Sequence, residues 1–165
     1  MEHDMTQVNE QAVEAFLQDG GTLAMLNDVS TDTLEQLYTL GFNQYHAGKH
    51  DEAHKIFQAL CVLDHYEARF FLGLGACRQA LGQFRQAIDS YSYGAMMDLQ
   101  EPRFAFHAAE CLLQLGELEG AESGFHSAQL LAAAKPELAE LAARAGIMLE
   151  VVKTKKDMEH AFDKQ

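Results

Sequence analysis

The 165-residue chain contains two prolines, no tryptophan and only three cysteines. So few prolines, together with many Ala, Leu, Gln and Glu residues, favour helices over strands. Cys61, Cys77 and Cys111 are odd in number and include no C-x-x-C pair, which argues against a disulfide framework and a zinc site. We expect three reduced, buried thiols in a cytoplasmic protein.

Basic residues are also scarce, and no long apolar run is present. Twelve Lys and Arg against 25 Asp and Glu give a net charge of −13, which phosphate backbones and anionic lipid headgroups would repel. No stretch approaches the length of a transmembrane helix, and the first residues lack the features of a secretion signal. The composition therefore predicts no nucleic-acid partner and no membrane association. With 48% apolar residues the chain can bury the core of a single domain.

An internal repeat of 34 residues organises the chain. A glycine recurs at this spacing and is followed five positions later by alanine and nine positions later by an aromatic residue. This pattern is typical of a helix, a tight turn and a second, antiparallel helix, with the glycine in the left-handed conformation that ends a helix. The repeated positions are Gly48, Gly82 and Gly116, then Ala53, Ala87 and Ala121, then Phe57, Tyr91 and Phe125.

These positions resemble the tetratricopeptide repeat and predict an all-α superhelical solenoid. Asp32 and Glu35 form a candidate capping box that opens the first repeat, and Pro102 and Pro136 suit the first turn of a helix. We expect one domain over 1–165, with a mobile tail over 1–9, an N-terminal helical region over 10–33, repeats over 34–67, 68–101 and 102–135, and a C-terminal capping helix over 136–161.

Two motifs resemble catalytic or cofactor sites but lack essential parts. His50 and His54 are four residues apart, but Asp51 stands where a zinc protease needs glutamate. Gly73 and Gly75 could begin a dinucleotide-binding loop, but a third glycine and a preceding strand are lacking. We interpret the histidines as solvated turn residues and predict no metal, no cofactor and no enzymatic activity.

A second apolar stripe on the first helix of the first repeat predicts a binding surface. Leu40 and Gly41 belong to the stripe that packs inside the repeat. Tyr38, Phe42 and Tyr45 lie about 100° further round the helix, on the face that lines the concave groove of stacked repeats. The alternative is that these three rings are core residues. The matching positions of the later repeats are Arg69, Leu72, Ala76, Gln79, Arg103, Phe106, Glu110 and Leu113.

The composition of this predicted groove favours an extended peptide as its ligand. Apolar residues are mixed with a few polar ones, which would provide pockets for side chains and hydrogen-bonding groups for a backbone. Exposed apolar patches of this kind generally mark binding sites.

Several longer runs resemble one protein family. They are GGTLAML (20–26), DTLEQLY (32–38), FQALCVLDHY (57–66), FFLGLGACRQ (70–79), EPRF (101–104) and HAAEC (107–111). Together they span most of the chain and resemble the class II chaperones of bacterial type III secretion systems, which serve translocator proteins. The sequence departs from the family at Ala105, where proline is expected, and we expect this difference to loosen the start of a helix.

The resemblance implies a cytoplasmic, non-enzymatic chaperone. Such a protein binds the two hydrophobic translocators separately before export and holds an extended N-terminal segment of each in the concave groove. It keeps them from associating, aggregating or inserting into bacterial membranes. Family members often form homodimers. A repeat scaffold that joins soluble partner proteins is the alternative function, and a hydrolase that uses His50 and His54 is a third.

Overall fold

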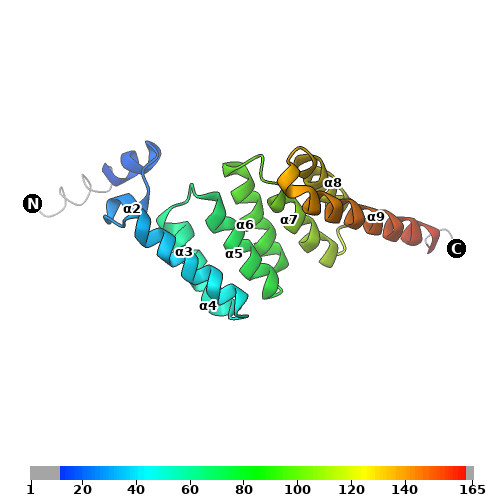
Figure 1. Ribbon diagram of the computed structural model, residues 1–165, viewed down its shortest axis with the longest axis horizontal. Coiled ribbons are helices and arrows are strands. Elements are labelled where there is room, and N and C mark those ends of the chain that lie inside the picture. The colour runs from blue at the N-terminus through cyan, green and yellow to red at the C-terminus, as the bar shows by residue number, and fades with distance from the viewer. Residues whose placement is uncertain (1–11, 163–165) are drawn as a thin grey trace, which may run out of the picture.

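The computed structural model describes residues 12–162, so the tail predicted over 1–9 lies outside the described residues. Helices follow one another along this part of the chain, which contains no strand, and stack into the elongated solenoid of Figure 1. The all-α prediction is confirmed. Besides a short helix over 12–18, the elements are α2 (Leu23–Leu26), α3 (Thr31–His46), α4 (His50–Leu63), α5 (Ala68–Ala80), α6 (Phe84–Met97), α7 (Pro102–Gln114), α8 (Leu118–Ala133), a 3-10 turn (Pro136–Leu138) and α9 (Ala139–Phe162). None of these helices is long and apolar enough to cross a membrane.

Three antiparallel helix pairs form the body of the solenoid: α3 with α4, α5 with α6, and α7 with α8. The second helix of each pair also packs against the helix that follows it, so that α9 packs against α8 at the C-terminal end. The first helices contact one another along the stack, α3 with α5 and α5 with α7. They therefore share one side of the solenoid, as expected for stacked two-helix repeats.

The turn inside each pair is built on the repeated glycine. Gly48, Gly82 and Gly116 have φ angles of 76°, 73° and 75°, a region that costs other residues free energy. The residue after each glycine donates its N–H to a carbonyl near the end of the preceding helix, as Gln83 does to Arg78 at 2.8 Å. This closure is the common way to end a helix at a left-handed residue, so the prediction for the three glycines is confirmed.

The aromatic ring of each second helix lies in the core, and two of the rings pack against glycines of the first helices. Phe57, Tyr91 and Phe125 are at most 2% exposed. A Cβ atom added to Gly73 would lie 2.2 Å from the ring of Phe57, and one added to Gly75 would lie 2.3 Å from the ring of Tyr91. These distances are well below van der Waals contact. Ring packing therefore explains the two glycines that resemble a nucleotide-binding loop.

The first repeat begins at a different cap from the predicted one. Ser30 precedes α3, and its hydroxyl accepts the N–H of Thr33 at 3.1 Å. The capping box proposed for Asp32 and Glu35 is therefore wrong, because Asp32 already lies in the first turn of the helix. The prediction that Leu40 packs inside the repeat is also wrong, since this residue is 45% exposed.

Both prolines stand at the start of helical segments, as their spacing predicts. Pro102 is the first residue of α7, and Glu101 before it accepts the N–H of Arg103 at 3.0 Å. This regular start contradicts the loosening that we expected from Ala105. Pro136 opens the 3-10 turn, and the capping helix α9 begins after that turn rather than at the proline.

The two histidines at the start of α4 are not the solvated turn residues that the sequence suggests. His50 is the first residue of α4, and its ring lies against Tyr45 with the centroids 5.1 Å apart. Its Nδ1 atom and the Nε2 atom of His54 are buried without a hydrogen-bond partner within the described residues. In the same part of the chain, no group of three His, Cys, Asp or Glu side chains could hold a metal ion.

Substitution of Ala87 tests the register of the repeats. Ala87 is fully buried between the paired helices, so Ala87→Glu places an unpaired carboxylate in the core, at a cost of several kcal/mol. The matched control is Gln83→Glu, because Gln83 is exposed at the start of the same helix. Thermal denaturation followed by circular dichroism should show a large loss of melting temperature for Ala87→Glu alone. Equal melting temperatures would show that the register is wrong.

The environment of His54 predicts a pH dependence of stability. Burial lowers the pKa of His54 below its usual 6.5, and Arg78 lowers it further while Asp51 opposes the shift. The unfolded chain therefore takes up a proton before the folded chain does, and this site loses stability as the pH falls below about 6.5.

We expect the melting temperature of the wild-type chain to fall relative to that of a His54→Gln variant between about pH 7.5 and about pH 5.5. Comparing the two proteins removes the effect of the acidic surface, which both share. His160→Gln, at an exposed position near the end of α9, should follow the wild type. Parallel melting curves for wild type and His54→Gln would contradict this account.

Candidate peptide-binding groove

A groove with a volume of about 430 Å³ lies along the side of the solenoid that the first helices share. Helices α3, α5, α7 and α9 each contribute side chains to it, and the second helices contribute two rings at its base. The lining residues are Tyr38, Phe42, Tyr45, His46, Phe57, Arg69, Leu72, Gly73, Ala76, Gln79, Tyr91, Arg103, His107, Glu110 and Arg144.

The structure brings most of the predicted residues together. Tyr38, Phe42, Tyr45, Arg69, Leu72, Ala76, Gln79, Arg103 and Glu110 all line this groove. Phe106 does not, because it is 1% exposed and its ring packs edge-on against Phe125 with the centroids 5.5 Å apart. Leu113 packs against the same C-terminal core and also lies outside the groove. A role in peptide binding stays a prediction for all of these residues.

The aromatic stripe on α3 divides between core and groove. The ring of Tyr38 packs against the buried rings of Phe57 and Phe70, with centroid distances of 5.8 and 6.0 Å. Tyr45 also packs against this core, where burial raises the pKa of its hydroxyl. Phe42 is 48% exposed and makes its aromatic contacts with Tyr38 and His46 on its own helix. Phe42 is therefore the ring that is most available to a ligand.

A chain of hydrogen bonds crosses the middle of the groove and joins three helices. The Tyr91 hydroxyl donates to Gln79 Oε1 at 2.8 Å, and Gln79 Nε2 donates to Glu110 Oε2 at 3.1 Å. His107 Nδ1 lies 2.8 Å from the same carboxylate oxygen. Burial alone would raise the pKa of Glu110, but the contacts with His107 and Gln79 outweigh it and lower the pKa. Glu110 is therefore a carboxylate at neutral pH, and its charge is fixed in position by the neighbouring helix.

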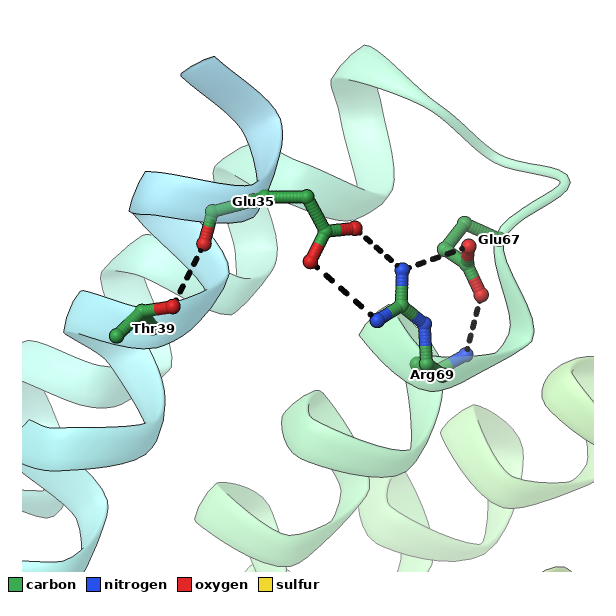
Figure 2. A network of polar contacts seen from close by, with 4 residues as sticks. All are labelled: Glu35, Thr39, Glu67 and Arg69. Carbon is green, nitrogen blue, oxygen red and sulfur yellow. Dashed lines mark hydrogen bonds and ion pairs between the residues drawn. The ribbon is translucent and has the colours of Figure 1, made fainter. Parts of the chain in front are cut away.

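Arginines line the groove of a strongly acidic protein. Arg69 donates to Glu35 Oε1 at 2.6 Å and to Glu67 Oε2 at 3.1 Å, as Figure 2 shows, and its guanidinium lies 5.0 Å from the centroid of the Tyr38 ring. These contacts tie the first repeat to the second. Arg103 is paired in the same way with Glu101, the residue before its helix.

Arg144 on α9 is a lining residue that sequence reasoning missed. Its guanidinium lies 4.9 Å from the centroid of the Phe106 ring and 4.0 Å from Glu110. It stands 34 residues after Glu110, which itself follows Ala76 and Phe42 at the same spacing. Extending the repeat into the capping helix would therefore have identified it.

Comparisons with solved structures place this solenoid among known proteins. No family model matches the chain. A crystal structure of a type III secretion complex from Aeromonas hydrophila contains a chain that is 97% identical, with a TM-score of 0.88 over 90% of this chain and 99% of that one. The type III secretion translocator chaperone SycD from Yersinia enterocolitica is 69% identical, with a TM-score of 0.76 over 79% of this chain and 98% of SycD.

The chain belongs to the translocator chaperones of type III secretion. Another relative of this translocator chaperone is PcrH from Pseudomonas aeruginosa. A structure of PcrH with the chaperone binding region of PopD is 72% identical, with a TM-score of 0.76 over 77% of this chain and 96% of that one. A second, with the corresponding region of PopB, is 74% identical, with a TM-score of 0.71 over 73% and 97%.

Proposed function

We propose that this chaperone binds an extended N-terminal segment of each of its two translocators in the groove, one translocator at a time. The observation that carries the proposal is a groove built from one face of four successive first helices, with a half-exposed ring at Phe42. The complexes of PcrH with regions of two different proteins, PopD and PopB, support one chaperone for two clients.

The lining of the groove suits an extended backbone. The guanidinium groups of Arg69, Arg103 and Arg144 can donate to backbone carbonyls, and the Glu110 carboxylate can accept a backbone N–H. Apolar groups between them, at Phe42 and Leu72, offer places for side chains. Because the polar groups are already held by ion pairs and hydrogen bonds, little side-chain freedom is lost when a peptide binds.

The charge of the protein fits a role as a holder of apolar clients. A net charge of −13 keeps a complex with a poorly soluble partner in solution by mutual repulsion. In this proposal the chaperone acts in the cytoplasm without catalysis, cofactor or metal, and prevents the translocators from associating with each other or inserting into bacterial membranes. A scaffold for soluble proteins would instead have partners that stay soluble when they are expressed alone.

Phe42→Ala tests the groove. Truncating a central aromatic contact typically costs roughly 2–4 kcal/mol of binding, a loss of affinity of about thirty-fold to a thousand-fold. Because Phe42 is 48% exposed, its truncation should leave the melting temperature nearly unchanged. Isothermal titration with a translocator N-terminal peptide, together with thermal denaturation, measures both effects. Moderate salt should leave the affinity largely intact, since the main contacts are apolar.

Two variants on the same helix provide controls. Leu40→Ala removes a 45% exposed side chain that does not line the groove and should change neither binding nor stability. Tyr38→Ala should lower both, because the Tyr38 ring packs against the core and also lines the groove. If Phe42→Ala binds the peptide normally, or unfolds at a much lower temperature, the groove is not the binding site that we propose.

A further inference from the structure

The capping helix α9 carries apolar residues on two opposite faces. Ala145, Leu149 and Val152 are buried against the rest of the C-terminal core. Ile147 and Val151 point away from that core and are 65% and 41% exposed. A helix that ends a solenoid normally turns a polar face to solvent, so the second apolar face of α9 needs an explanation.

The exposed face continues along the helix as a regular stripe. Ile147, Val151, Thr154 and Met158 follow one another at intervals of four, three and four residues, and Met158 is 57% exposed. These intervals are those of the seam of a two-stranded coiled coil. With 24 residues, α9 is the longest helix of the described chain, and it runs on past α8 to the C-terminal end of the solenoid in Figure 1.

The charges beside the stripe indicate how a partner helix would lie. Glu150 flanks the stripe on one side and Lys155 on the other, five residues later. In a parallel pair of identical helices, a residue at the first of these positions faces the residue at the second in its partner. Glu150 of each copy would then meet Lys155 of the other, twice per pair. An antiparallel pair would instead bring like charges together.

We propose that this stripe (Ile147, Val151, Thr154 and Met158) is a self-association interface, on which α9 of a second copy packs in parallel and in register. The buried face of α9 points in the opposite direction, so the two solenoids would lie on the outer sides of the helix pair. The stripe spans about two heptads, which is too short for a strong coiled coil, so the association is weak and reversible. This inference does not depend on the proposed function of the groove.

Engineered cysteines test the parallel register. In a parallel pair each seam residue faces its own counterpart, within the distance that a disulfide can bridge. Under oxidation with copper phenanthroline, full-length Val151→Cys and Met158→Cys should each become mostly disulfide-linked dimers on a non-reducing gel. The control Lys153→Cys, on α9 but off the stripe, should remain mostly monomeric. The natural Cys61, Cys77 and Cys111 are buried and do not compete.

A second measurement separates this interface from other contacts. Val151→Glu should increase the dissociation constant for self-association at the stripe at least tenfold in sedimentation velocity, without changing the melting temperature. Crosslinking of only one of the two seam variants would indicate an antiparallel pair and overturn the proposal. So would crosslinking no faster than that of the control, or unchanged self-association of Val151→Glu with loss of translocator binding, which would mean that a client helix covers the stripe.

Discussion

The close packing of aromatic rings against glycines sets the geometry of this solenoid. Phe57 of α4 reaches Gly73 of α5, and Tyr91 of α6 reaches Gly75 within the same repeat. A single added methyl group at either glycine would have to displace a ring that is fully enclosed. The same contact therefore fixes the spacing of helices inside one pair and from one pair to the next. Everything on the groove side of the molecule depends on that spacing.

Because the rings of the second helices fill the interior, the first helices keep one face free. That face carries Phe42, Ala76, Glu110 and Arg144 at a constant spacing of 34 residues. One register position thus supplies an exposed ring, a small residue, an acid and a base in succession. Hydrogen bonds from Tyr91 through Gln79 to Glu110 connect this face to the packed interior, so the groove is held in shape by the core beneath it.

The repeat made the fold predictable, because glycine turns, small residues and rings all obey one spacing. Most of the groove followed for the same reason, since α3, α5 and α7 present equivalent positions to the same side. Phe106 was misplaced because it meets α8 and α9 at the end of the stack, where the C-terminal core closes over it. The burial of His50 and His54 was missed because the packing of Tyr45 across the turn leaves no sequence signal. Arg144 was missed because the repeat register was not carried into α9.

Site-specific photo-crosslinking tests most directly whether the translocator lies along the first helices. Full-length chaperone would carry p-benzoylphenylalanine at position 42, in the groove, or at position 62, where Val62 is 57% exposed on the second helix α4. After irradiation with a bound translocator, the account predicts crosslinks from position 42 to the N-terminal segment of the client and far fewer from position 62. Crosslinks to that segment from position 62 but not from position 42 would contradict it.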